Sequence, residues 1–547
     1  MKTNIRYCSF LTLIISFIFL YVSACKKETL TDNKNSSDTT VQLSGDKAIL
    51  SFKVPYQLGN AVITDSTVEI TVTYNAPKKL VPTIEISQGA TIEPASGTEV
   101  DFSKGEYTFK VMAADSSIKF WRVILKRQPK IKGAIVSADL PGYTTETTIG
   151  KTYVVISVTG SVGYRNLAPV FATNEYVTSE PASGTPRDFS SGYADYTLVS
   201  ADSTRTIWRI YVVGKKFEAD NSNILYTGRI DKSDPKSPKF SAPGVYITAK
   251  FKGTALDIEL VDEYKWGSYR NYFQVVIDNQ EPVRFRTEAN RTIYRIASNL
   301  TNTTHTVRII KDTEAGIGYL ILKALYTDEL LPADPLPARK IECFGNSITC
   351  GFGIYADMCD KAVDNEWYIA NAAALSYGAI TAQNLNAQYH LTSVSGIGLV
   401  HSCCNMTYTM PDVYDKIFID NPSSKAWNFN NYVPDVVTIC LGQNDGIQDS
   451  AQFTQAYIGF IDNLKSHYPQ AHFFCLTSPM ADNTLFAYQK KILTGIENYY
   501  LSKGDDRVHK VFLSNNLQSG CGSHPDRIQH QQIANELTQV IRGVMNW

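Results

Sequence analysis

Residues 47–329 contain short segments in which apolar and polar side chains alternate, as in VEITV at 68–72 and LDIEL at 256–260. Such alternation is typical of β-strands that bury one face, and Gly, Pro, Asn and Ser turns separate the segments. From residue 339 the pattern changes to apolar runs of strand length that alternate with longer amphipathic stretches. The chain is therefore expected to be β-rich first and to end in an α/β domain.

One part of the β-rich region occurs twice. EPASGT stands at 93–98 and again at 180–185, and Trp121 recurs as Trp208, each pair at an offset of 87 residues. This repeat predicts two tandem immunoglobulin-like β-sandwiches, at 47–127 and 128–216. The repeated tryptophan could bind sugar, but both copies lie inside an apolar run that closes the module, which favours a place in the core. A structural role as a spacer is the favoured interpretation of the two modules.

The rest of the chain divides into two regions and a linker. Residues 217–329 again alternate as strands do and predict an antiparallel β-sandwich of jelly-roll type. Three prolines within 330–338 indicate a short stiff linker. Residues 339–547 predict a parallel, flavodoxin-like sheet with helices on both faces. The expected strands are 340–344, 389–394, 435–441, 472–476 and 510–513, and the expected helices are 370–385, 453–467, 485–501 and 528–544.

The first 25 residues resemble a bacterial lipoprotein signal. Lys2 and Arg6 precede an apolar stretch at 10–21 that is too short to span a membrane comfortably. Small residues then lead to Cys25, which on this pattern would be lipidated and become the mature N-terminus; an ordinary secretory signal is the alternative. The polar segment 26–46 is expected to be a flexible tether. These features predict a lipid anchor in the bacterial cell envelope, in the outer membrane, facing the periplasm or the exterior.

The charge, the cysteine spacing and the glycine pattern of the chain argue against several classes of partner and cofactor. A net charge of −1, with no block of like charge, argues against nucleic acid as a partner. Eight of the ten cysteines lie between Cys343 and Cys521, and their spacing matches no zinc pattern. The glycines of 345–353 and of 396–398 complete neither a phosphate loop nor a dinucleotide fingerprint. No metal or cofactor is expected.

Four polar groups follow predicted strands of the α/β region, and together they suit acyl-ester hydrolysis. Ser347 follows the first strand, Gly396 the second and Asn444 the third, and His524 precedes the last helix. Ligands of such sheets bind beyond the carboxyl ends of the strands. Ser347 is the expected nucleophile and His524 its base, and the oxyanion would be held by the backbone N–H groups of Ser347 and Gly396 and by the amide of Asn444. On its own stretch, Ser347 could instead be a helix cap.

Four short motifs in this region resemble blocks I, II, III and V of the SGNH (GDSL-like) hydrolases. They are GNSIT at 345–349, SGIG at 395–398, GQND at 442–445 and His524-Pro525. Residues 217–547 as a whole are similar to carbohydrate esterase family 2, the acetyl xylan esterase type. Further matching segments include YTGR at 226–229, KDTEA at 311–315 and MPDVY at 410–414. The resemblance implies removal of acetyl groups from polysaccharides or oligosaccharides of the xylan or mannan type, without a metal.

One position departs from the SGNH pattern. An acid usually stands three residues before the catalytic histidine, where this chain has Cys521. Members of carbohydrate esterase family 2 often use a Ser–His dyad in which a backbone carbonyl orients the histidine, so the resemblance implies a dyad of Ser347 and His524. Asp526 is an alternative orienting acid, although its position suits the start of the last helix. Asp445 is expected to shape its loop by hydrogen bonds to the backbone.

Other side chains near the motifs are candidates for secondary roles. His401 and His530 are expected to be structural. Trp427 is the candidate for stacking on a sugar ring, although core packing is the favoured interpretation, and Trp367 and Tyr408 are weaker candidates.

The leading hypothesis is an exported serine esterase that removes O-acetyl groups from polysaccharide through a covalent acyl-enzyme. One alternative is a surface glycan-binding lipoprotein whose hydrolase fold is inactive. The other is an esterase of lipid or small acyl esters. Acetate release from acetylated glycans, and the preferred acyl chain length, separate the three.

Overall fold

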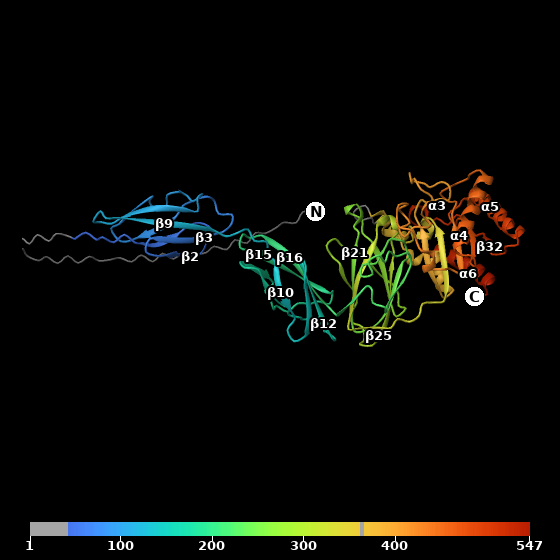
Figure 1. Cartoon of the computed structure of the whole chain (residues 1–547), viewed down its shortest axis with the longest axis horizontal. Coiled ribbons are helices and arrows are strands. Elements are labelled where there is room, and N and C mark those ends of the chain that lie inside the picture. The colour runs from blue at the N-terminus through green and yellow to red at the C-terminus, as the bar shows by residue number, and fades with distance from the viewer. Residues whose placement is uncertain (1–41, 361–365) are drawn as a thin grey trace, which may run out of the picture. The chain divides into compact units, whose positions relative to one another are not determined.

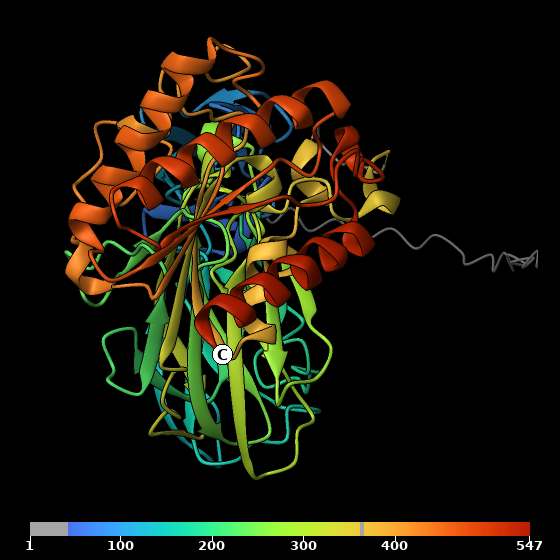
Figure 2. The ribbon, with the colours of Figure 1, turned by 90° about the vertical axis from the view of Figure 1, so that its right-hand side faces the viewer.

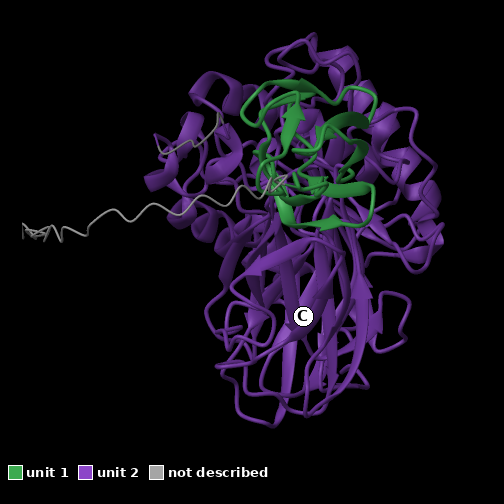
Figure 3. Cartoon of the chain, turned by 90° about the vertical axis from the view of Figure 1, so that its left-hand side faces the viewer, with its two compact units in different colours: residues 1–129 green, residues 130–547 purple. Residues whose placement is uncertain are grey.

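The computed structural model describes residues 42–360 and 366–547, and the chain divides into two compact units after Pro129 (Figures 1 and 3). The signal and lipidation predictions for residues 1–25, and most of the predicted tether, lie outside the described residues. Among the helices that are described, none is long and apolar enough to cross a membrane.

The first unit is built from short strands with one main sheet. Its central sheet has the order β2-β3-β9-β8-β6, in which β3 and β9 run parallel. On β3 the side chains of Val68, Ile70 and Val72 are buried, as the alternation at 68–72 predicts. The strands are β1 (Ile49–Lys53), β2 (Gln57–Ile63), β3 (Thr67–Val72), β4 (Lys79–Leu80), β5 (Thr83–Ile86), β6 (Thr91–Glu93), β7 (Val100–Asp101), β8 (Glu106–Met112) and β9 (Ile118–Arg127).

The second copy of the sequence repeat has the same topology, in the second unit. Its main sheet has the order β11-β12-β16-β15-β14, with β12 and β16 parallel. Trp121 and Trp208 are both buried, and their indole N–H groups donate to the carbonyls of Lys47 and Gly133. The core interpretation of the repeated tryptophan is therefore confirmed. The strands are β10 (Ile135–Asp139), β11 (Thr144–Ile149), β12 (Tyr153–Thr159), β13 (Val170–Thr173), β14 (Val177–Glu180), β15 (Tyr193–Ser200) and β16 (Arg205–Val213).

Two antiparallel sheets follow, and we call them the β-module (215–331). One sheet has the order β17-β26-β21-β24 and the other β18-β20-β25-β22-β23, with β19 and β27 at their sides. The strands are β17 (Lys215–Glu218), β18 (Ile224–Thr227), β19 (Lys239–Phe240), β20 (Tyr246–Lys252), β21 (Leu256–Asp262), β22 (Tyr272–Ile277), β23 (Val283–Arg286), β24 (Ile293–Ala297), β25 (Thr304–Lys311), β26 (Leu320–Thr327) and β27 (Glu329–Leu331).

The C-terminal region contains the predicted parallel sheet, in the order β29-β28-β30-β31-β32. Its strands are β28 (Arg339–Gly345), β29 (Ala387–Ser393), β30 (Val436–Cys440), β31 (His472–Leu476) and β32 (Val508–Val511). Helices α4 and α5 pack on one face, and α2 and α6 on the other (Figure 2). The helices are α1 (Ser347–Cys350), α2 (Tyr377–Asn384), α3 (Met410–Val413), α4 (Ser450–His467), α5 (Asn483–Ser502) and α6 (Arg527–Met545).

The helix expected at 370–385 begins only at Tyr377. Ser376 caps it, and its side chain accepts a hydrogen bond from the N–H of Ala379. Immediately upstream, the N–H groups of Ala373 and Ala374 donate to the carbonyl and carboxylate of Asp312 in the β-module. Residues 371–375 thus contact the β-module and form a loop with one 3-10 turn, so the helix begins later than predicted.

The β-module and the parallel sheet share buried contacts. Arg229 of the β-module donates to Glu342 of β28 at 2.9 Å, and the side chains are 1% and 0% exposed. The same guanidinium donates to the carbonyls of Tyr414 and Lys416 at 2.5 and 2.7 Å. A buried ion pair that loses one partner leaves an uncompensated charge, so this contact holds the two regions in one arrangement.

Candidate active site

Three strand ends gather at one edge of the parallel sheet. In register, Gly345 of β28 lies opposite Ser393 of β29 and Cys440 of β30. Ser347, Gly396 and Asn444 follow these positions by a few residues, so their loops are neighbours at the carboxyl edge of the sheet. This is the edge at which open parallel sheets bind ligands.

Ser347 occupies the first position of the short helix α1. The preceding residue, Asn346, caps the helix with its side chain, which accepts from the N–H of Ile348 at 3.2 Å. Ser347 is therefore not the cap, and its hydroxyl is free for another partner. Its side chain is 7% exposed, so it lies at the floor of the site rather than on the open surface.

The structure brings Ser347 and His524 together from positions 177 residues apart. The distance from Ser347 Oγ to His524 Nε2 is 2.8 Å. On the other side of the ring, His524 Nδ1 lies 2.8 Å from the carbonyl oxygen of Gly522. A carbonyl can only accept, so Nδ1 carries the proton and Nε2 is left to accept the proton of the serine. This is the geometry of a nucleophile and its base.

A backbone carbonyl, not a carboxylate, orients His524 among the described residues. Asp526, the alternative acid, instead caps α6: its side chain accepts from the N–H of Gln529 at 2.8 Å. The turn that carries the histidine is fixed by the disulfide Cys359–Cys521. Burial lowers the pKa of His524, with partial opposition from the carbonyls of Gly522 and Cys521, so the imidazole is neutral near pH 7.

The three predicted oxyanion donors lie on adjacent loops. Neither Ser347 nor Gly396 donates its backbone N–H to an acceptor within the described ranges. Asn444 Nδ2 donates one of its two hydrogens to the carbonyl of Ile397 at 2.8 Å, which joins the loops after β29 and β30. Gly396 has φ +84°, and a Cβ there would lie 3.0 Å from Cys403 Sγ. A side chain at this position would be strained and crowded, so glycine is required.

Asp445 holds the loop after β29 in place. Its carboxylate accepts the backbone N–H groups of Leu399, Val400 and His401 at 2.7 to 3.0 Å, and it is buried. The prediction that Asp445 shapes a loop through the backbone is confirmed. Because Asp445 follows Asn444 directly, the same contact fixes the position of that amide.

The β-module reaches the same loop from the other side. Glu314 is buried, and its carboxylate accepts from the N–H of Ser395 at 2.9 Å and from its hydroxyl at 2.8 Å. Ser395 immediately precedes Gly396. The β-module therefore supplies a positioning residue for the oxyanion loop, from the KDTEA segment to which the sequence assigned no role in the site.

Aromatic rings continue outward from the histidine. Phe352 lies 4.4 Å from the His524 ring, centroid to centroid, and Trp367 stacks on Phe352 at 5.6 Å. Trp367 is 45% exposed, so one part of its surface faces solvent. Sugar rings commonly pack on exposed aromatic faces, and this ring is better placed for that role than the sequence indicated.

Trp427, the candidate for stacking on a sugar ring, lies away from the catalytic serine. Its ring packs against His390 and the guanidinium of Arg229, and it is buried. The hollow beside it is also lined by Lys340 and Gln388, at the amino ends of β28 and β29. That end of the sheet is opposite to the end that carries Ser347. Core packing, the favoured interpretation of Trp427, is the observed role, and the ring lies outside the catalytic site.

The two other candidate histidines have structural contacts. His530 is fully buried, its Nδ1 accepts from the N–H of Tyr377 at 3.1 Å, and burial lowers its pKa to about 3. His401 Nδ1 lies 3.3 Å from the carbonyl oxygen of Asn444. Tyr408 donates through its hydroxyl to the carbonyl of Asp420 at 3.3 Å. Within the described ranges, no group of three His, Cys, Asp or Glu side chains is placed to hold a metal ion.

Comparison with known families agrees with this site. Residues 341–535 match the family described as GDSL-like Lipase/Acylhydrolase, and residues 226–335 match Carbohydrate esterase 2 N-terminal. A family two carbohydrate esterase from Clostridium thermocellum, solved in complex with cellohexaose, is 31% identical with a TM-score of 0.55. It aligns with 59% of this chain and 99% of its own. The chain belongs to carbohydrate esterase family 2.

Other members of family 2 show the same extent of similarity. A family two carbohydrate esterase from Cellvibrio japonicus is 28% identical with a TM-score of 0.56, over 61% of this chain and 98% of that one. The cellulase/esterase CelE of Acetivibrio thermocellus is 33% identical over 342 residues, 60% of this chain but only 40% of CelE. An acetylxylan esterase / glucomannan deacetylase of Cellvibrio japonicus is 29% identical over 338 residues, 60% of this chain and 91% of that protein.

The family 2 similarity does not extend over the N-terminal repeats. Residues 49–124, the first copy, match a separate family described as SGBP, N-terminal. This match covers most of the first compact unit. The repeats are therefore an addition to the esterase region rather than part of it.

Proposed function

We propose that this chain is a serine esterase that removes O-acetyl groups from a polysaccharide of the xylan or mannan type. The observation that carries the proposal is the contact of 2.8 Å between Ser347 Oγ and His524 Nε2, with Nδ1 held by the Gly522 carbonyl. The relatives named acetylxylan esterase / glucomannan deacetylase support the choice of substrate class.

The proposed reaction has two halves. Ser347 Oγ attacks the acetyl carbonyl while His524 Nε2 takes the hydroxyl proton, and the oxyanion is held by the N–H groups of Ser347 and Gly396 and by the Asn444 amide. The C–O bond to the sugar then breaks, and the imidazolium returns the proton to the departing sugar oxygen. In the second half His524 takes a proton from a water molecule whose oxygen attacks the carbonyl of the acetyl-serine. The bond from that carbon to Ser347 Oγ then breaks, the imidazolium returns the proton to Oγ, and the acetic acid formed leaves and ionises to acetate in solvent.

The Ser347→Ala variant tests this proposal. Acetate release from acetylated xylan and acetylated glucomannan is expected to fall by about 10⁴-fold or more, because the nucleophile is lost while the oxyanion donors remain. Ser523→Ala is the matched control, since this exposed serine directly precedes His524, whereas the ring nitrogens of His524 lie against Gly522 and Ser347. Wild-type protein that binds these glycans but releases no acetate would instead indicate a binding protein with an inactive hydrolase fold. A best rate on butyrate or longer acyl esters would indicate a different substrate class.

We further propose that residues 47–127 and 128–216 are immunoglobulin-like sandwiches and that the β-module is a jelly roll. The two matching sheet orders support the first assignment, and the paired antiparallel sheets support the second. The repeats would act as a spacer that carries the esterase away from a membrane.

Anchoring at the outer membrane of a bacterial cell envelope, through lipid on Cys25, is also a proposal. It is supported by the lipoprotein-like sequence of residues 1–25. In cells fed a labelled fatty acid, the wild-type chain is expected to carry the label and to fractionate with membranes. Label that persists in the Cys25→Ser variant would overturn the assignment of the lipid to that residue.

A further inference from the structure

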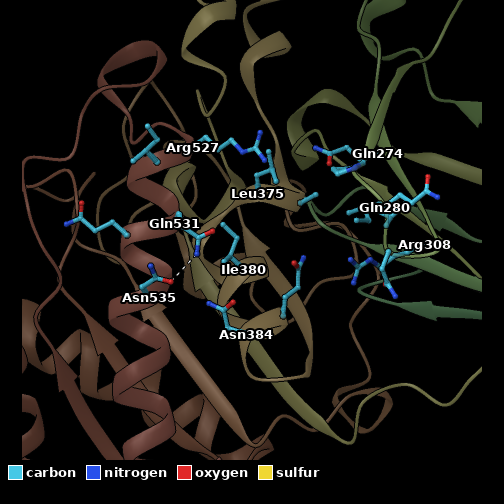
Figure 4. Close-up of a pocket in the computed structure, with 17 residues that line it drawn as sticks. Gln274, Gln280, Arg308, Leu375, Ile380, Asn384, Arg527, Gln531 and Asn535 are labelled. Atoms are coloured by element: carbon cyan, nitrogen blue, oxygen red, sulfur yellow. Dashed lines mark hydrogen bonds between the residues drawn. The ribbon is translucent and has the colours of Figure 1, made fainter.

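A cavity of about 790 Å³ separates the β-module from the helices α2 and α6. Gln274, Gln280 and Arg308 lie on its β-module side, and Leu375, Ile380 and Asn384 lie opposite them (Figure 4). Ser347 and His524 do not line it. Its volume is within the range of ordinary ligand sites. We call this cavity the amide groove.

The charge of the amide groove is positive. Its 17 lining residues include two arginines, Arg308 and Arg527, and no Asp or Glu. Within the described ranges neither arginine makes an ion pair, although other arginines of the β-module such as Arg284 and Arg295 have carboxylate partners. Arg308 Nε is buried without a hydrogen-bond partner. A guanidinium that is partly desolvated and unpaired suits a planar anion, which it can bind through two parallel hydrogen bonds.

The rest of the lining suits sugar hydroxyl groups. Eight side chains of the groove are amides, among them Asn384, Gln531 and Asn535. Each amide offers both donors and an acceptor, as a pyranose ring with several hydroxyls requires. Ile528 is 78% exposed at the groove and offers an apolar surface to the C–H face of a ring.

We propose that the amide groove binds a uronic acid unit of the polysaccharide, with its carboxylate attracted by the positive charges of Arg308 and Arg527. The identity of the ligand as part of the substrate rests on the esterase function proposed above. Arg527 follows His524 by three residues, and its N–H donates to the carbonyl of Ile354 at 3.2 Å, so one end of the groove adjoins the catalytic turn. The groove thus selects acidic substituted chains, whereas the catalytic site acts on the acetyl group.

The test compares binding of two ligands by calorimetry. One is a xylo-oligosaccharide with a glucuronate substituent, and the other is the neutral oligosaccharide of the same length, both free of acetyl groups. Wild-type protein is expected to bind the acidic ligand about tenfold more tightly, a difference that corresponds to one charge-assisted contact. Arg527→Gln and Arg308→Gln are expected to remove most of that difference. Arg527 is exposed, so its variant reports on binding without a folding penalty.

Arg165→Gln is the matched control, because it removes the same charge from an exposed residue that does not line the groove. Equal binding of the two oligosaccharides by wild-type protein would overturn the inference, as would a preference that both groove variants retain. Tighter binding of inorganic phosphate than of the acidic oligosaccharide would also overturn it. Hydrolysis of 4-nitrophenyl acetate by the wild-type protein is measured separately. Absence of hydrolysis would overturn the esterase proposal and leave the binding result intact. Hydrolysis together with equal binding of the two oligosaccharides would overturn the groove inference and leave the esterase proposal intact.

Discussion

The Asp445→Asn variant tests whether the Asp445 carboxylate has a structural or a catalytic role. The substitution keeps the shape of the side chain and removes its charge. In the native protein Oδ1 accepts three N–H groups, at 2.9, 2.7 and 3.0 Å, and Oδ2 accepts a fourth bond, from Leu399, at 3.0 Å. The asparagine would keep one oxygen and would turn an NH₂ group toward the N–H of Leu399.

The expected loss of stability follows from these contacts. A hydrogen bond to a charged acceptor contributes about 1.5–3 kcal/mol and one to a neutral acceptor about 0.5–1.5 kcal/mol, so three weakened bonds lose about 3 kcal/mol together. At about 2–4 °C per kcal/mol for a domain of roughly 200 residues, the midpoint of thermal unfolding is expected to fall by about 6–12 °C. The loop would also hold Asn444 and Gly396 less firmly. Loss of one oxyanion donor costs about 10²–10³ in kcat, which sets an upper limit for the effect on rate.

The assay pairs thermal unfolding with initial rates on an acetyl ester at a temperature where the variant is folded. Asp449→Asn is the matched control, because Asp449 caps α4 with one hydrogen bond to the N–H of Gln452, and asparagine caps a helix as well as aspartate does. A rate loss of about 10⁴ with no change in unfolding would refute the reasoning, since it would assign Asp445 to the chemistry as the orienting acid of a triad. Unchanged stability and unchanged rate would refute it as well.

Three further predictions concern the same site. Burial lowers the pKa of His524, so the rate is expected to fall on acidification with a midpoint below about 6.5, and a midpoint above that value would contradict the assignment of the base. Replacing Cys359 and Cys521 together by serine opens a loop of 162 residues. We expect the free energy of unfolding to fall by about 2–5 kcal/mol and kcat to be reduced. Thermal unfolding and rates that both match wild type would contradict this. Glu314→Ala removes the acceptor for both hydrogen bonds of Ser395 and is expected to lower kcat by about 10-fold to 10²-fold, below the cost of losing an oxyanion donor outright, whereas Glu314→Gln should retain more activity.

The strand ends of the parallel sheet could be predicted from the sequence because two independent patterns agree there. Apolar runs fix the strands, and the residues that follow each run must lie at one edge once the strands are parallel. The long separation of Ser347 and His524 is no obstacle to this inference, since the topology rather than the spacing brings them together. The broken helix at 370–385 shows the limit of the approach. The residues before Tyr377 instead donate backbone N–H groups to Asp312 of the β-module, a contact that no local pattern contains.

The contacts between modules could not be predicted. Trp427 is an aromatic residue near the motifs, and only the position of Arg229 and His390 shows that it packs in the core. Glu314 lies 81 residues before Ser395, and its KDTEA segment matched the family without indicating a contact with the oxyanion loop. The amide groove likewise combines side chains from β-strands and from two helices, so no window of the sequence contains it. Periodicity describes one element at a time, whereas these features depend on how elements pack.

The absence of an acid before His524 has a physical consequence for the base. Cys521 stands where the acid usually stands, and its disulfide to Cys359 fixes the backbone of the turn. Gly522, with φ +60°, then presents its carbonyl to Nδ1 at 2.8 Å. Burial of the ring lowers the folded-state pKa of His524, and the Gly522 carbonyl opposes this shift only in part, because a neutral acceptor stabilises an imidazolium less than a carboxylate does. The resulting base is weaker than that of a triad but is mainly neutral at neutral pH. The site therefore depends on the oxyanion loop, and on the residues Glu314 and Asp445 that hold it, for the stabilisation that an acid would otherwise supply.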